Sequence, residues 1–274
     1  MTQADPHPPA SCIVVGYDGS DESDFALQWA ARVAQRRRCP LQVVSATEID
    51  RTRVDLVSPE REESYLRQAQ QTAEAGAQRA REIAGIEVQA AGWAGDAANS
   101  LLESAQHAAL IVVGHRARGV LPDTVLGSVA FKLSHHAPCP VAVVPRSPRP
   151  LPSMEHPVVA GIDGSDHAER ALQEAARLAA DTGSWLRIVV AGEPRQAQQL
   201  ASQAAARVQA RHPALTVRPA IDEEPADQAI LAQSRDASLI VVGARGLGGL
   251  QGLLLGSVSK KVMQGAECAV YVVR

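Results

Sequence analysis

Short apolar runs alternate with longer segments of helical periodicity along the whole chain. Typical runs are IVVG at 13–16, LIVVG at 110–114 and VAVV at 141–144, in which no polar side chain interrupts the β-branched residues. Such runs are typical of strands that are buried on both faces of a sheet. Because helical segments separate them, the pattern predicts βαβ units and a parallel sheet with right-handed crossovers.

The same series of elements is predicted twice. In the first half we expect strands at 12–17, 41–46, 86–91, 110–114 and 141–144, and helices at 23–37, 60–84, 96–107 and 125–135. In the second half we expect strands near 158–162, 185–190, 215–219, 238–243 and 269–273, again with helices between them. Each half is therefore predicted to be a doubly wound α/β domain with a five-stranded parallel sheet and flanking helices.

The two halves are copies of one sequence unit. Residues 13–34 align with 158–179 at an offset of 145, and residues 110–129 align with 239–258 at an offset of 129. The difference between these offsets means that the second copy lacks 16 residues between the two matches. The chain is therefore predicted to be a tandem duplication.

A proline-rich segment separates the two copies. PRSPRPLP at 145–152 cannot continue a helix or a central strand, and it is typical of a stiff, extended linker. We expect a first domain within 1–150, after a disordered N-terminus at 1–11. We expect a second domain within 151–274, after the proline-rich linker at 145–157.

Composition narrows the classes of protein to which the chain can belong. Hydrophobic residues make up 46% of its 274 residues and charged residues 21%, which is enough apolar material for a sizeable core. The formal net charge of −3 and the aromatic content of 3% argue against a nucleic-acid partner. No apolar run approaches the roughly 20 residues that span a bilayer, so we expect no membrane partner.

Two further features predict a cytoplasmic protein. The N-terminus has neither the basic start nor the apolar segment of a signal peptide. Cys12, Cys39, Cys139 and Cys268 lack the spacing of metal ligands, and we expect them to be buried thiols in a reducing compartment.

A carboxylate follows the first predicted strand of each copy. GYDGSD at 16–21 contains Asp18, and its twin GIDGSD at 161–166 contains Asp163. Ligands of doubly wound folds bind at the carboxyl ends of the strands, where such a carboxylate can accept hydrogen bonds from a hydroxyl or an amine. The alternative is a simple Asp-Gly turn in which the following serine caps the next helix.

A glycine-rich loop follows LIVVG in each copy and leads into a Gly-Ser helix start. In the second copy this loop is GARGLGGLQGLLLGS at 243–257. Glycine can adopt a positive φ and lets backbone N–H groups approach an anion closely, and the N-terminus of the following helix favours phosphate. The loop therefore predicts a phosphate site, with the Ser257 hydroxyl as one more donor. An ordinary glycine-rich surface loop is the alternative.

The spacing of this loop resembles the nucleotide-binding signature of the universal stress protein family. Gly243, Gly246, Gly256 and Ser257 match the signature Gly-x-x-Gly, nine residues, Gly-Ser, position by position. The DGS turns resemble the aspartate with which that family contacts adenosine. The resemblance covers nearly the whole chain and implies a tandem universal stress protein of the bacterial type, with strand order 3-2-1-4-5 in each domain.

The resemblance also implies a ligand, an adenine nucleotide such as ATP with Mg²⁺ as a candidate companion ion. In the second domain it assigns nucleotide contacts to Asp163, Gly164, Val190, Gly243, Arg245, Gly246, Gly248, Gly256, Ser257 and Val258. In the first domain it assigns them to Asp18, Gly19, Val44, Gly114, Arg116, Gly127, Ser128 and Val129. It assigns no catalytic residue and no metal ligand.

The two copies depart from each other in the glycine-rich loop. Ala117 stands where the second glycine of the signature belongs, and a Cβ there costs about 1–2 kcal/mol if the position needs a positive φ. Asp123 adds a carboxylate that repels phosphate. We therefore predict that the second domain binds nucleotide more tightly than the first.

The resemblance favours an ATP-binding regulatory protein of the stress response with little or no turnover. A weak ATPase or autokinase remains an alternative, with Ser128 or Ser257 as the acceptor, so whether the chain is an enzyme stays open. A scaffold that binds no nucleotide is the third reading. Because the last strands of both copies are apolar and lie at sheet edges, we expect an intrachain pseudo-dimer, and the resemblance suggests a homodimer of the chain.

Overall fold

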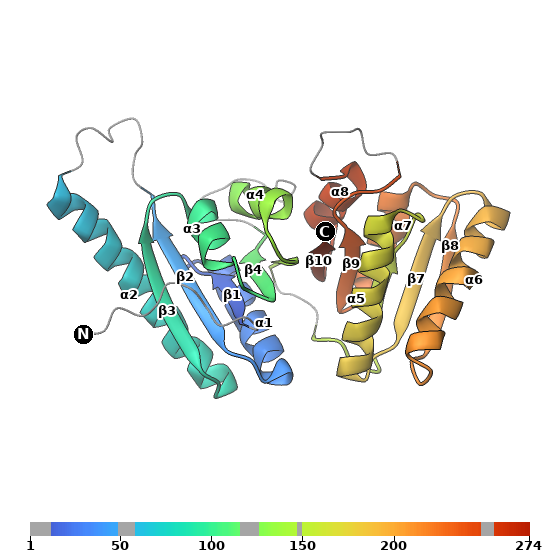
Figure 1. Cartoon of the computed structure of the whole chain (residues 1–274), viewed down its shortest axis with the longest axis horizontal. Coiled ribbons are helices and arrows are strands. Elements are labelled where there is room, and N and C mark those ends of the chain that lie inside the picture. Colours follow the sequence, from blue (N-terminus) through green and yellow to red (C-terminus); the bar gives the residue numbers. More distant parts are fainter. Residues whose placement is uncertain (1–11, 49–57, 116–125, 147–149, 248–254) are drawn as a thin grey trace. The chain divides into compact units, whose positions relative to one another are not determined.

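The computed structural model describes residues 12–48, 58–115, 126–146, 150–247 and 255–274. The chain forms two compact units, Met1–Arg146 and Ser147–Arg274, each built around its own parallel sheet (Figure 1). No helix in the described segments is long and apolar enough to cross a membrane.

The first unit has five parallel strands in the order β3-β2-β1-β4-β5. The strands are β1 (Ile13–Gly16), β2 (Leu41–Thr47), β3 (Val88–Ala94), β4 (Leu110–Gly114) and β5 (Val141–Val144). The helices are α1 (Asp21–Arg37), α2 (Pro59–Ala84), α3 (Ala97–Ser104) and α4 (Ser128–His136). Helices α1 and α2 contact each other on one face of the sheet, and α3 and α4 contact each other on the opposite face.

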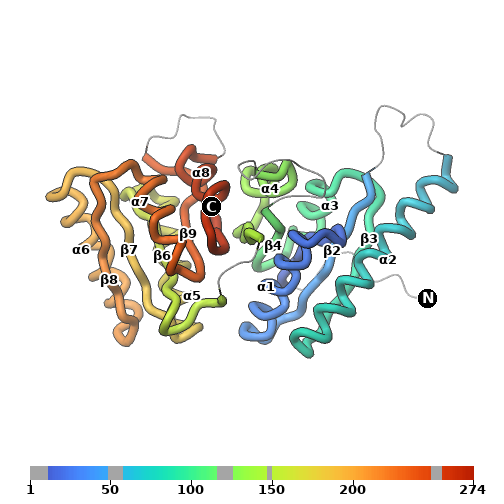
Figure 2. The backbone as a smooth tube through the Cα atoms, turned by 180° about the vertical axis from the view of Figure 1, so that it is seen from behind, coloured from blue at the N-terminus to red at the C-terminus, as the bar shows by residue number. Residues whose placement is uncertain are grey.

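The second unit repeats this topology with the order β8-β7-β6-β9-β10 (Figure 2). Its strands are β6 (Val158–Gly161), β7 (Leu186–Ala191), β8 (Val217–Asp222), β9 (Leu239–Gly243) and β10 (Ala269–Val273). Its helices are α5 (Asp166–Thr182), α6 (Pro194–Arg211), α7 (Ala226–Ala232), the short 3₁₀ helix η2 (Gln233–Arg235) and α8 (Ser257–Gly265). The predicted fold class and the strand order 3-2-1-4-5 are confirmed in both units.

The third strand of each unit lies further along the chain than its apolar pattern predicts. We expected 86–91 and 215–219, but the strands are Val88–Ala94 and Val217–Asp222. Both are end strands of their sheets, and every residue of β8 is at least partly exposed. An end strand is covered less completely, so its hydrophobic pattern marks its limits poorly.

The residues missing from the second copy shorten one connection and the helix after it. Helix α2 has 26 residues, whereas its counterpart α6 has 18. The connection before the helix spans residues 48–58 in the first unit and only 192–193 in the second. Both differences follow the second strand of the unit and leave the strands around the centre of each sheet unchanged.

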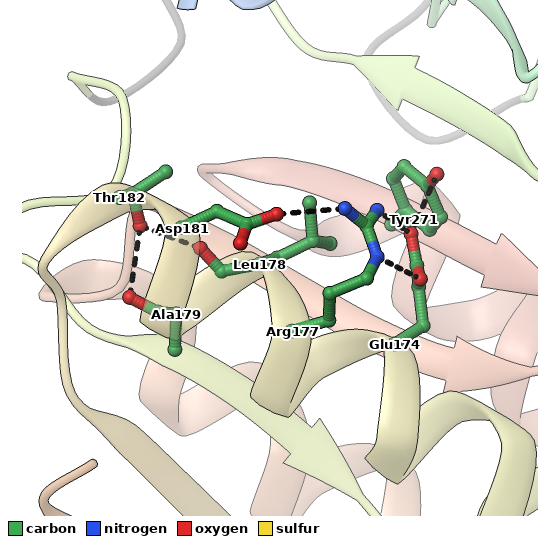
Figure 3. Close-up of polar contacts among 7 residues, drawn as sticks. All are labelled: Glu174, Arg177, Leu178, Ala179, Asp181, Thr182 and Tyr271. Atoms are coloured by element: carbon green, nitrogen blue, oxygen red, sulfur yellow. Dashed lines mark hydrogen bonds and ion pairs between the residues drawn. The ribbon is translucent and has the colours of Figure 1, made fainter. Parts of the chain in front are cut away.

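A network of charged and phenolic groups holds α5 against β10 (Figure 3). The Tyr271 side chain is only 1% exposed, and its hydroxyl donates to Glu174 Oε1 at 3.2 Å. Arg177 donates two hydrogen bonds to the same carboxylate, at 2.8 and 2.6 Å, and one to Asp181 at 2.7 Å. This bidentate contact raises the pKa of Arg177 further above its ordinary value.

Candidate functional site

Each unit contains a cavity at the carboxyl ends of its central strands, at the point where the strand order reverses. The second-unit cavity measures about 270 Å³ and is lined by Gly161, Ile162, Asp163, Ala168, Val189, Ala191, Ala226, Ile230, Val242, Gly243, Arg245, Gly246, Leu255, Gly256, Ser257, Val258 and Ser259. The first-unit cavity measures about 300 Å³ and is lined by Gly16, Tyr17, Asp18, Ser23, Val44, Ala46, Glu48, Ala97, Leu101, Val113, Gly114, Gly127, Ser128, Val129 and Ala130. Two independent copies of the sequence thus form the same kind of cavity at the same place.

The aspartate after the first strand lines the cavity in each unit. Asp163 Oδ1 accepts the N–H of Ser165 at 3.0 Å, and Asp163 Oδ2 accepts the N–H of Leu247 at 2.8 Å. In the first unit, Asp18 Oδ1 accepts both the N–H and the hydroxyl of Ser20, at 3.0 and 2.5 Å. Backbone and side-chain donors therefore fix the orientation of both carboxylates.

The serines of these turns also cap the next helix, as the alternative interpretation of the DGS turn predicts. Ser20 Oγ accepts the N–H of Ser23 at 3.2 Å, and Ser165 Oγ accepts the N–H of Ala168 at 3.2 Å. The two interpretations are compatible, because the serine caps the helix while the aspartate lines the cavity.

A helix start without a side-chain cap also lines each cavity. Helix α4 begins at Ser128 after Gly127, and α8 begins at Ser257 after Gly256, and neither N-cap residue supplies a side-chain hydrogen bond. The Ser259 hydroxyl, one residue further into α8 than Val258, donates to the carbonyl of Gly243 at 2.7 Å and ties the helix start to the end of β9. First-turn N–H groups and the helix dipole at such a terminus favour an anion.

A close approach of the backbone, rather than a positive φ, accounts for Gly246 in the second-unit loop. Gly243, Gly246 and Gly256 do not have a positive φ, so that expectation is wrong for them. Instead, a Cβ on Gly246 would collide with the Asp163 carboxylate, because the loop backbone passes directly against that side chain. Close approach to Asp163 therefore explains the glycine at 246.

Most of the predicted nucleotide contacts lie around the two cavities. Those lining the second cavity are Asp163, Gly243, Arg245, Gly246, Gly256, Ser257 and Val258. Those lining the first cavity are Asp18, Val44, Gly114, Gly127, Ser128 and Val129. Gly19 and Gly164 do not line them, but they occupy the turns beside the aspartates with φ of 75° and 88°. Arg116 and Gly248 lie outside the described residues, as do Ala117 and Asp123.

Val190 is one residue out of register with its predicted role. The N–H of Tyr17 donates to the carbonyl of Val44 at 2.9 Å, and the equivalent bond runs from Ile162 to the carbonyl of Val189 at 3.0 Å. Val189 is thus the counterpart of Val44 and lines the cavity, whereas Val190 does not. Neighbouring side chains of a strand point to opposite faces, so a shift of one residue removes the side chain from the site.

Several lining residues were not predicted from the sequence. Leu101 of α3 and Ile230 of α7 cover the strand ends at Gly16 and Gly161, where any Cβ would press against them. Leu101 and Ile230 align at the offset of 129, but an apolar residue on a helix carries no sign of a ligand site. Glu48, which directly follows β2, was also missed and lines the first cavity.

Cationic groups surround the loop of the second cavity. Burial and the nearby Arg170, Arg245 and Arg274 lower the pKa of His167 below its ordinary value, although Asp166 opposes this shift. Burial and Arg245 likewise lower the pKa of Arg274. Arg245 itself lines the cavity, and its buried Nε has no hydrogen-bond partner within the described segments. An anion bound here would relieve the mutual repulsion of these groups.

Comparison with known proteins identifies the family. The model of the universal stress protein family matches residues 11–145 and 189–274, which is more than half of the chain. The chain belongs to the universal stress protein family. The resemblance inferred from the sequence motifs is therefore confirmed.

Full-length relatives share the tandem arrangement of this universal stress protein. Universal stress protein Rv1996 of Mycobacterium tuberculosis is 33% identical over 305 residues, which cover 96% of this chain and 94% of the relative. A universal stress protein of Mycolicibacterium smegmatis is 32% identical over 283 residues, with 96% of both chains covered. The crystal structure of a universal stress protein from Archaeoglobus fulgidus is 23% identical, with a TM-score of 0.75 and coverage of 96% of this chain and 98% of that one. This last similarity concerns the fold alone.

Proposed function

We propose that this universal stress protein binds an adenine nucleotide, with ATP as the leading candidate, and acts as a stress-response regulator with little or no turnover. The observation that carries the proposal is the second-unit cavity, in which Asp163 and the uncapped start of α8 line one space of about 270 Å³. A carboxylate suits the hydroxyl or amine groups of a nucleoside, and a helix start suits its phosphates. Val189 and Ile230 supply apolar walls for the base.

Mg²⁺ would be held mainly by the phosphates of such a ligand. Among the described residues there is no group of three or more histidine, cysteine or acidic side chains arranged to hold a metal ion. Mg²⁺ commonly binds through substrate phosphates, waters and one or two carboxylates. The ion would neutralise part of the phosphate charge.

We propose that the second unit is the tighter of the two sites. Its cavity is lined by one acidic and one basic side chain, Asp163 and Arg245. The described lining of the first cavity contains two carboxylates, Asp18 and Glu48, and no basic side chain. Fewer negative and more positive groups favour a polyanionic ligand.

Nucleotide extraction from the purified full-length chain tests the proposal. We expect protein purified without added ligand to release adenine nucleotide on acid precipitation, and ATP added to the emptied protein to stay intact over many hours. Steady release of ADP would instead support a weak ATPase, and phosphate on Ser257 or Ser128 an autokinase. Protein that is empty and has no affinity for ATP would contradict the proposal and support a scaffold.

We further propose that the protein works in the cytoplasm. Cys12, Cys39 and Cys139 are free thiols, as is usual in a reducing compartment. Burial raises the pKa of both Cys12 and Cys139 to about 12, which keeps these thiols protonated and unreactive. Thiol labelling in cells lysed directly into denaturant would report all four cysteines of the sequence as reduced if this is right, and disulfides or blocked thiols if it is not.

We also propose that the apolar end strands β5 and β10 take part in association, either between the two units or between two chains. Their sequences, VAVV and AVYVV, carry no charge that would protect an exposed edge. Sedimentation of the full-length chain distinguishes a monomer from a homodimer. Val143→Lys should weaken the association of two chains if β5 lies in the contact between them. An unchanged sedimentation coefficient would exclude that strand from the contact.

A further inference from the structure

The loop after β9 is hydrogen-bonded to the aspartate of the second cavity. The N–H of Leu247 donates to Asp163 Oδ2 at 2.8 Å, while Oδ1 is engaged by the N–H of Ser165 at 3.0 Å. Each oxygen of the carboxylate therefore already has a backbone donor. Hydrogen bonds of this kind, from an N–H to an ionised carboxylate, are stronger than those between neutral groups.

The contact depends on the backbone alone. The Leu247 side chain is 72% exposed, so its packing contributes little to holding the loop in place. Gly246 has no Cβ, and one there would meet Asp163 Oδ2, so the carboxylate or the loop would have to shift. Glycine at this position thus lets the loop backbone lie directly against the aspartate.

The first copy has an alanine where the second copy has Gly246. Ala117 occupies the corresponding position. It lies outside the described residues, so the contact described here is that of the second unit.

We propose that the Leu247 N–H acts as a latch that competes with the ligand for Asp163, and that the latch makes the second unit select nucleoside polyphosphates over nucleosides. This inference rests on the proposed function. A nucleoside hydroxyl or amine that approaches Asp163 Oδ2 competes with the Leu247 N–H for that oxygen and gains nothing from the N–H afterwards. A polyphosphate does gain, because the N–H follows Gly246, which lines the cavity, and once released it can donate to the phosphates.

Two substitutions in the full-length chain break the latch by different routes. Leu247→Pro removes the N–H, and Gly246→Ala keeps every N–H but adds the methyl group that the contact cannot accommodate. Leu247→Ala keeps the N–H and the backbone, so it serves as the matched control. Circular dichroism and thermal unfolding of each variant show whether the unit stays folded.

Calorimetric titration with adenosine and with ATP gives the first readout. We expect both latch variants to bind adenosine about tenfold more tightly than the parent, since each relieves competition from one hydrogen bond to a charged group. The ratio of ATP affinity to adenosine affinity should fall in Leu247→Pro and stay at the parental value in Leu247→Ala. Unchanged or weaker adenosine binding in both latch variants would overturn the proposal.

Hydrogen exchange gives a second readout that needs no ligand. We expect the Leu247 amide to be protected in the nucleotide-free parent and to exchange faster in Gly246→Ala. Exchange in the parent at the rate of a fully exposed amide would overturn the latch.

The two proposals fail in different ways. If the parent does not bind ATP, the proposed function is wrong, but tighter adenosine binding in both latch variants would still support the latch. If the parent binds ATP while the latch variants keep the parental affinity for adenosine, the function stands and the latch is wrong.

Discussion

The contact between Tyr271 and Glu174 allows a quantitative test of what stabilises the second unit. The substitution Tyr271→Phe removes one hydroxyl from a side chain that is 1% exposed and leaves the ring in place. The hydroxyl donates to a carboxylate at 3.2 Å, which is long for an O–H donor, so its loss should cost about 1.5 kcal/mol, the lower end of the range for bonds to charged groups. The two bonds from Arg177 remain and keep Glu174 paired.

The substitution Glu174→Ala should be more damaging than Tyr271→Phe. It leaves the buried phenol without its acceptor and Arg177 without its main partner. Because 43% of the Arg177 side chain and 20% of the Glu174 side chain are exposed, solvent compensates part of the loss. We therefore expect a cost of about 2–3 kcal/mol, below that of a fully buried ion pair.

Urea unfolding followed by tryptophan fluorescence separates the second unit from the first. Trp185 is the one tryptophan of the second half of the sequence, so a background of Trp29→Phe and Trp93→Phe restricts the signal to that unit. At an m-value of about 1.5 kcal/mol/M, Tyr271→Phe should lower the midpoint by about 1 M. Tyr65→Phe, on the other unit, serves as the control and should not shift it. A midpoint for Tyr271→Phe within about 0.2 M of the parent would refute the role assigned to this hydrogen bond.

Two further predictions concern helix capping and pH. Ser20→Ala should cost the first unit about 2 kcal/mol, because it removes both the cap on α1 and the short bond to Asp18. Ser165→Ala removes the cap on α5 and only a long, weak bond of 3.5 Å to the carbonyl of Arg245, so it should cost about 1 kcal/mol. Equal losses in chemical unfolding would contradict this difference. The pKa of His167 is lowered in the folded state, so the unfolded chain takes up its proton first and the second unit should lose stability as the pH falls below about 6.5. His167→Gln should flatten this pH dependence in thermal unfolding, and an unaltered profile would exclude His167 as its source.

Much of the fold could be predicted because the strands β1, β4, β6 and β9 are buried on both faces. Their uninterrupted apolar sequences leave no alternative to central strands of a parallel sheet. The duplication supplied a second, independent instance of each element. End strands such as β8 carry a weaker pattern, because Pro219 and Arg218 on that strand are exposed, and its limits were misjudged accordingly.

The candidate site was predictable where a residue type has a specific role. Asp18 and Asp163 follow the first strand of each copy, and the Gly-Ser helix starts repeat. The aspartate and the helix start that line each cavity could therefore be inferred. The register of Val190 could not, because an apolar strand looks the same when it is shifted by one residue. The apolar walls formed by Leu101 and Ile230 were not apparent either, since a leucine or isoleucine on a helix is usually a core residue.

The reason for the glycine at 246 also required the structure. The sequence pattern is compatible with either a positive φ or a close approach, and only the position of the Asp163 carboxylate against the loop distinguishes them. Ala117, which occupies the corresponding position of the first copy, lies outside the described residues.

Titration of the full-length chain with ATP, together with two matched substitutions, tests whether the tighter ATP site lies at the start of α8. Ser257→Glu and Ser128→Glu each place a carboxylate at the first residue of α8 or α4, where it suits the helix dipole but occupies and repels the phosphate site. We expect Ser257→Glu to weaken the tighter ATP-binding event by more than about tenfold, a loss of about 1.4 kcal/mol, and Ser128→Glu to leave that event unchanged. ATP binding to Ser257→Glu at the parental affinity would contradict it.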